Sequence, residues 1–175
     1  MLPEIFARFE LVIYILAATL IASIYFAIRK RKLNQLIKHK QMTNAKAFRF
    51  GVETSMAISD EGLIGMVNFR LHTLTVDIKE IAKFEVLLGR YSIGNAKASK
   101  NDGLLFVGIA DKLKSIVAEE KIEEIGFIIT LKNNKTFGIY LHKSTRPKFL
   151  TEAKQNNIVQ LFTTLEAVEG KCKGK

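Results

Sequence analysis

The residues that could do chemistry are few and lie far apart in the chain. Its three histidines, His39, His72 and His142, stand in unrelated contexts, and no HxxxH, CxxC, DxD or GxSxG spacing occurs. Catalysis needs converging groups, such as a nucleophile with its base, paired carboxylates or a set of metal ligands. The chain is therefore not expected to be an enzyme, and no cofactor or metal site is expected.

Two weaker chemical signals also fail on inspection. Cys172 lies in the tail sequence KCKGK and has no second cysteine for a disulfide or a metal site. Gly89 and Gly94 have the first spacing of a phosphate-binding P-loop, but Asn95 and Ala96 stand where lysine and serine or threonine must hold phosphate and magnesium. We expect a solvated thiol at the tail and a mobile loop over residues 89–103.

The longest uninterrupted feature is an apolar segment, Leu11 to Ile28, which contains no charge, proline or glycine. As a helix it would cover roughly 27 Å, close to the ~30 Å hydrocarbon thickness of a bilayer. A cleaved signal peptide needs a basic start and a small-residue cleavage site, whereas this segment has an acidic start and ends in RKRK. We expect a single uncleaved transmembrane helix at residues 11–28.

The charges on the two sides of this segment differ in sign. Residues 1–10 carry Glu4, Glu10 and Arg8, and the chain as a whole has a formal net charge of +10. The positive-inside rule places residues 1–10 outside the cell membrane and everything after the span in the cytoplasm. Six basic residues that follow the span are expected to meet anionic headgroups at the membrane surface: Arg29, Lys30, Arg31, Lys32, Lys38 and Lys40.

Small residues recur every four positions within the span, at Thr19, Ser23 and Ala27. Such a face lets two helices approach closely, so it is a candidate helix–helix contact for a homo-oligomer or another membrane protein. The alternative is a monomer whose helix faces lipid. After the span, Leu33 and Ile37 fall on one side of a short helix that we expect to lie near the interface within the basic segment 29–44.

Downstream of residue 45 the apolar pattern changes to a period of two, which predicts strands. A closing helix is predicted from Pro147 to Glu169, with an apolar face that must pack on the sheet, and residues 170–175 form a basic tail. Residues 111–124 fit either a helix or a strand. Seven strands are predicted: Phe48 to Ile58, Leu63 to Phe69, Leu71 to Val76, Lys83 to Leu88, Leu104 to Ile109, Gly126 to Lys132 and Thr136 to His142.

This order of elements, with a turn at Asp60-Glu61-Gly62, the capping sequence Asp77-Ile78-Lys79-Glu80 and a hairpin around Asn133-Asn134, resembles the small bacterial pleckstrin-homology-like (PH-like) domains attached to membrane spans. The resemblance covers roughly residues 45–169. It implies an α+β, mainly β, fold in which two antiparallel sheets form a barrel or sandwich closed by the C-terminal helix. Lipid-binding members carry a basic first hairpin, whereas the corresponding turn here is acidic.

The expected function is a non-catalytic, membrane-anchored adaptor or accessory subunit that presents a basic domain to a protein partner at the cytoplasmic face. The alternative is a module that senses anionic lipid at the membrane surface. An enzyme of unrecognised type is the remaining alternative. Nucleic acid is not expected as a partner, because a domain tethered beside a membrane meets anionic headgroups first.

Overall fold

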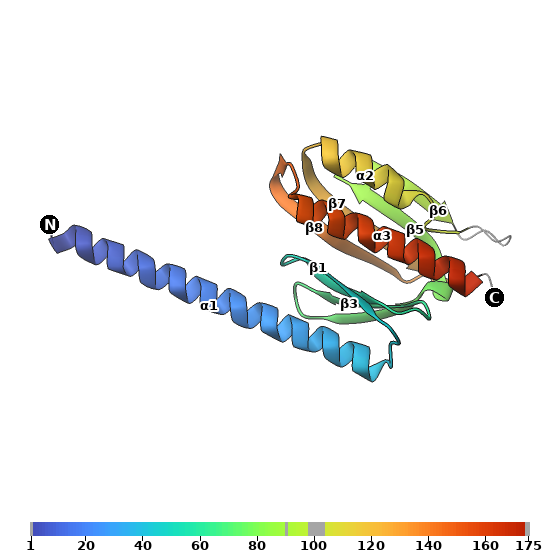
Figure 1. Cartoon of the computed structure of the whole chain (residues 1–175), viewed down its shortest axis with the longest axis horizontal. Helices are drawn as coiled ribbons and strands as arrows, with labels where there is room; N and C mark the ends of the chain where they lie inside the picture. Colours follow the sequence, from blue (N-terminus) through green and yellow to red (C-terminus); the bar gives the residue numbers. More distant parts are fainter. Residues whose placement is uncertain (1, 90, 98–103, 174–175) are drawn as a thin grey trace.

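The computed structural model describes residues 2–89, 91–97 and 104–173. A long helix, α1 (Leu2–His39), projects from an α+β domain made of two four-stranded antiparallel sheets and two further helices (Figure 1). The predicted N-terminal helix, two antiparallel sheets and C-terminal helix are thereby confirmed. The predicted barrel closure is not found, since among the described residues no strand of one sheet pairs with a strand of the other.

The first sheet is a meander of β1 (Lys46–Phe50), β2 (Thr54–Ile58), β3 (Leu63–Asn68) and β4 (Thr73–Asp77). The prediction of one long strand from Phe48 to Ile58 was wrong, because a turn at Gly51, where φ is 53°, divides it into a hairpin. Phe50 pairs with Thr54 and Phe48 with Met56, so even-numbered residues face inward on both strands. The alternating pattern therefore runs through the turn unchanged.

The second sheet has the order β6-β5-β7-β8, with β5 at Ile81–Leu88, β7 at Ile122–Leu131 and β8 at Thr136–Lys148. A 3₁₀ turn, η1 (Ile78–Glu80), leads into β5, and the Asp77 carboxylate accepts a hydrogen bond from the Lys79 amide as predicted. Strand β6 (Tyr91–Lys97) lies where a mobile loop was expected, so that prediction was wrong for these residues. Residues 98–103 of the predicted loop lie outside the described part of the chain.

The two helices of the domain differ from the expected boundaries. Residues 104–109 were predicted as a strand, but residues 104–108 form neither strand nor helix. Helix α2 (Ile109–Glu119) begins directly after Gly108, whose φ is 71°. The ambiguous segment 111–124 is thus mostly helix. Helix α3 (Glu152–Lys173) starts later than predicted because Pro147 belongs to edge strand β8, where its missing N–H removes no ladder bond. It also continues through residues 170–173, and Cys172 packs half-buried against the core.

The core lies between the two sheets and helices α2 and α3. Four buried rings meet at its centre: Phe84 lies 4.7 Å from Phe106, 5.2 Å from Phe127 and 6.1 Å from Phe162, measured between ring centroids. Hydrogen bonds to the backbone fix the position of Phe106, because the buried Glu169 carboxylate accepts from the amides of Leu105 and Phe106. Helix α3 is therefore part of the core rather than an appendage.

A second apolar cluster lies on the outer face of the first sheet, under the C-terminal half of α1. Leu33 and Met42 pack there against Ala57 and Val67, so β2 is buried on both faces. Gly65 is needed at this contact, because a Cβ placed on it would lie 3.0 Å from Cδ2 of Leu36. The apolar side of the segment after the span was expected to lie near the membrane interface, but the sheet covers it.

Replacing Phe162 with alanine should lower the free energy of unfolding by about 3–5 kcal/mol, because the substitution leaves a cavity among four packed rings. The neighbouring exposed Thr163, whose hydroxyl bonds only to the Val159 carbonyl, is a matched control whose change to alanine should cost less than about 0.5 kcal/mol. Unfolding of the intact chain in detergent, followed by circular dichroism, measures both. Equal stability of the two variants would contradict this account of α3.

Candidate functional site

Helix α1 is long and apolar enough to cross a membrane, on the evidence of length and composition. Its most apolar 18-residue window has a mean hydropathy of 2.4, and none of that window is buried by the rest of the chain. Large apolar side chains such as Leu16, Leu20 and Ile21 are more than half exposed. The part of the chain that the structure describes therefore leaves the N-terminal part of α1 uncovered, while the C-terminal part of α1 belongs to the domain.

Tyr25 connects α1 to two turns of the first sheet. The Tyr25 hydroxyl donates hydrogen bonds to the carbonyl of Phe69 at 2.8 Å and to that of Val52 at 3.4 Å. These two carbonyls belong to the β3–β4 and β1–β2 turns, whose Phe69 and Val52 side chains are 56% and 55% exposed. Two apolar turn residues thus lie beside the last part of the apolar segment of α1.

Two of the six residues predicted to meet headgroups are instead used inside the fold. Arg29 is 1% exposed, and its guanidinium donates to the carbonyl of Gly51 at 2.7 Å. Lys32 is half-buried and donates to the carbonyl of Leu71 at 2.9 Å. The cationic groups of these two residues thus tie α1 to the β1–β2 and β3–β4 turns of the first sheet, and their membrane-surface role stays a prediction.

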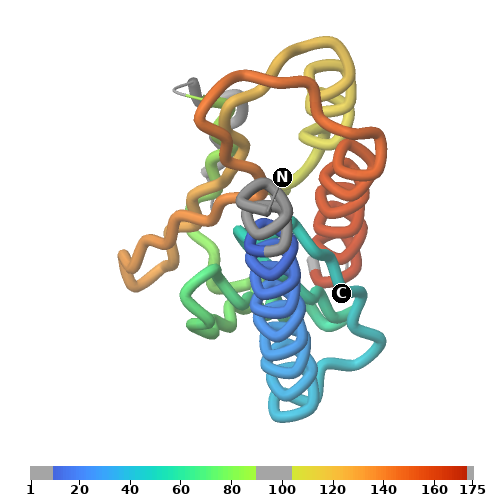
Figure 2. The backbone as a smooth tube through the Cα atoms, turned by 90° about the vertical axis from the view of Figure 1, so that its left-hand side faces the viewer, coloured from blue at the N-terminus to red at the C-terminus, as the bar shows by residue number. Residues whose placement is uncertain are grey.

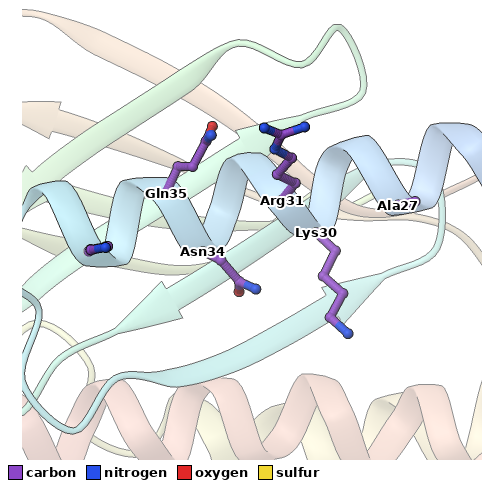
Figure 3. A pocket seen from close by; sticks show the side chains of 6 residues that line it. Ala27, Lys30, Arg31, Asn34 and Gln35 are labelled. Atoms are coloured by element: carbon purple, nitrogen blue, oxygen red, sulfur yellow. The ribbon is translucent and has the colours of Figure 1, made fainter.

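The other four residues of that set are exposed. Figure 3 shows Lys30 and Asn34 pointing to one side of α1, with Arg31 and Gln35 pointing to the other. Because α1 is continuous, Lys38 lies thirteen residues, or ~20 Å along the axis, beyond Tyr25. Lys38 therefore lies farther along α1 from the apolar segment than Lys30 and Arg31 do, and the membrane-surface role of all four residues stays a prediction.

The predicted helix–helix contact lies on an open face of α1. The hydroxyls of Thr19 and Ser23 bond back to the carbonyls of Leu16 and Thr19, both at 2.8 Å, so neither needs a partner helix for hydrogen bonding. Ala27 is exposed as well. This contact stays a prediction.

A small basic pocket of about 300 Å³ lies between α1 and the β1–β2 hairpin. Its charged lining consists of Arg29, Lys30 and Arg49, together with the hydroxyl-bearing Ser55. Within the described chain, Nε of Arg29 is buried and has no hydrogen-bond partner. The pocket therefore offers cationic donors next to the C-terminal end of the apolar segment. The sequence did not predict it, because Arg49 is twenty residues away from Arg29 along the chain.

A much larger, mainly apolar space of about 1320 Å³ lies on the other side of the β1–β2 turn; we call it the membrane-proximal cavity. Viewed from the N-terminal end of α1, the β3–β4 turn and the β7–β8 hairpin project to the same side of the helix (Figure 2). Sequence patterns could not predict the cavity, because it forms between segments far apart in the chain. Its lining comes from α1 (Ala18, Ile21, Ala22, Tyr25, Phe26), the first sheet and its turns (Val52, Glu53, Thr54, Met66, Asn68, Phe69, His72, Thr73, Leu74) and β8 (Thr136, Phe137, Gly138, Ile139, Tyr140, Lys143).

A buried histidine–lysine pair lies behind this cavity. Nζ of Lys154 is 2.8 Å from Nδ1 of His142, a side chain that is 2% exposed. Burial, and then the charge of Lys154, lower the pKa of His142, although Glu53 opposes this; burial also lowers the pKa of Lys154. The pair is best satisfied when charged Lys154 donates to neutral His142. It ties α3 to β8 and lines no pocket described above.

The other candidate groups do not converge. His39 is exposed at the end of α1 and His72 is exposed in the β3–β4 turn. Across residues 2–89, 91–97 and 104–173, no three or more His, Cys, Asp or Glu side chains are grouped as metal ligands would be. No protein-family model matches the chain, and no curated protein or solved structure is similar to it at the threshold applied.

The His142–Lys154 pair predicts a dependence of stability on pH. Since the pKa of His142 is lowered in the folded state, the unfolded chain binds more protons once the pH falls below about 6.5. Stability should be full above that pH and should decline as the pH falls toward the lowered value. Changing His142 to glutamine should remove this part of the decline, whereas changing exposed His72 should not. Melting temperatures of the intact chain between about pH 5 and about pH 8 measure it, and identical slopes in all three proteins would contradict the prediction.

Proposed function

We propose that this chain is a non-catalytic, membrane-anchored module with PH-like architecture, whose basic domain binds a protein partner at the cytoplasmic face of the cell membrane. The observation that carries the proposal is the packing of α1 from Tyr25 to Leu36 along the first sheet. A helix that is both membrane span and part of the domain holds that domain at a fixed height. Such a fixed domain suits an accessory subunit better than a freely tethered sensor.

The surface that we propose for the partner is the C-terminal half of β8. This strand lies at the edge of its sheet, and Lys143, Arg146 and Lys148 are exposed there. Pro147 and the charges discourage edge-to-edge pairing with a second copy, while a basic edge attracts acidic segments. The cytoplasmic orientation assumed here follows from the basic residues after the span.

Affinity purification of the intact chain from mild detergent should recover a defined protein. Changing Arg146 and Lys148 together to glutamine should reduce its recovery several-fold, because two cations leave the proposed surface. Changing Lys112 and Lys114 on α2 removes the same charge from an exposed helix and should leave recovery unchanged. If no protein is recovered, or both double variants behave alike, the proposed partner surface is wrong.

The second candidate function is sensing of anionic lipid, and the basic pocket is the observation that favours it. Arg29, Lys30 and Arg49 converge within a few turns of the span, where a phosphate-bearing headgroup would be in reach. This candidate needs only lipid, so it can be tested without any protein partner.

For this candidate, changing Lys30 and Arg49 together to glutamine should lower the enrichment of anionic lipid around the chain. The matched control changes Lys38 and Lys40 to glutamine, because these exposed lysines carry the same charge but do not line the basic pocket. Lipid retained by the chain after extraction from mixed phosphatidylglycerol and phosphatidylcholine vesicles, quantified by mass spectrometry, measures the effect. An equal loss in both variants would mean that general charge, rather than the pocket, attracts the lipid.

A further inference from the structure

The membrane-proximal cavity is a large apolar space that opens beside the predicted membrane span. We propose that it holds an acyl chain of a phospholipid from the cytoplasmic leaflet. The proposal rests on the membrane anchoring inferred above, but it requires neither the protein partner nor the basic pocket.

The position of the cavity along α1 points to lipid as its occupant. Ala18 lies seven residues before Tyr25, so the cavity runs ~10 Å along the helix from Tyr25 toward the N-terminus. Residues 18–26 fall inside the apolar segment 11–28. When that segment spans a bilayer, this part of the cavity faces lipid, and its contents can exchange with the leaflet without crossing water.

The deeper lining suits a hydrocarbon chain. Met66 and Leu74 contribute from the first sheet, and Phe137 and Ile139 contribute from β8. Pockets for drug-sized molecules typically measure roughly 300–1,000 Å³, so a space of about 1320 Å³ has room for an acyl chain and part of a headgroup. Transfer from the leaflet exchanges one apolar environment for another, so the choice of lipid depends on the polar rim.

That rim carries the groups expected at a membrane interface. Nζ of Lys143 lies 4.7 Å from the centre of the Tyr140 ring, and the exposed Phe69 ring stands under Arg70 at 5.3 Å. Paired aromatic and basic side chains are characteristic of the headgroup region. One carboxylate, Glu53, also lines the cavity and accepts a hydrogen bond from the Lys143 amide at 3.3 Å. The exposed Lys143 ammonium also pairs with the Glu124 carboxylate at 3.5 Å, so a phosphate at this rim would share the lysine with Glu124.

Small residues create the space. Ala18 and Ala22 on α1 face the cavity, and a Cβ placed on Gly138 of β8 would meet no atom within 4 Å. Because Gly138 lines the cavity and its Cβ position is free of neighbours, we expect a phenylalanine there to be accommodated and to obstruct the cavity. This gives a variant that should fold and still obstruct the occupant.

The experiment reconstitutes the full chain into vesicles of phosphatidylcholine with phosphatidylglycerol that carries a diazirine at the end of one acyl chain. After illumination, labelled residues are mapped by mass spectrometry. We expect adducts on cavity residues of the sheets, such as Leu74 and Ile139, in addition to adducts on α1. Gly138→Phe should reduce the sheet adducts several-fold and leave those on the open face of α1 unchanged.

The matched control is Ala17→Phe, which adds the same ring to α1 at an exposed position that does not line the cavity. It should leave the sheet adducts intact. Adducts confined to α1, which would show that the chain had inserted, or sheet labelling that Gly138→Phe does not alter, would overturn the proposal. If the sheets are unlabelled while purification recovers a protein, the lipid proposal is overturned and the adaptor proposal stands without the lipid site.

Discussion

Burial of the C-terminal half of α1 against the outer face of the first sheet is the contact on which the rest of the structure depends. It covers a face that would otherwise expose Ala57 and Val67 to water, and it uses the cationic groups of Arg29 and Lys32 as donors to turn carbonyls. A buried arginine is costly unless its charge is well hydrogen-bonded, so the β1–β2 turn is held where Gly51 can accept. The two pockets on either side of that turn exist because the turn is fixed.

Local patterns predicted the elements whose determinants are close in sequence. Asp77 caps its turn, and Asn134 adopts the left-handed conformation (φ 63°) that joins β7 to β8, because both depend on neighbouring residues alone. The apolar stripe of α3 was recognisable for the same reason. Its starting point was not, because β8 continues through Pro147 to pair Lys148 with Ile122 at the far end of the hairpin partner β7.

The errors arose where tertiary contacts override the local pattern. The apolar run that contains Leu105 and Phe106 suggested a buried strand. Both residues are buried, but their amides donate to the side chain of Glu169 rather than to a neighbouring strand. Strand β6 has a polar sequence typical of a loop, yet pairing with β5 along one edge is enough to order its backbone. The candidate sites were even harder to predict from the sequence, because each combines residues of α1 with residues of strands that are far away in the sequence.

The continuity of α1 also has a mechanical consequence. A span adjusts to bilayers of different thickness chiefly by tilting, and a flexible linker would absorb that motion before it reached the domain. Here Tyr25, Arg29 and Leu33 join the helix to the first sheet over more than two turns, so the whole domain must rotate with the span. If α1 spans a bilayer, a change in bilayer thickness would therefore change the angle between the basic edge of β8 and the plane of the membrane.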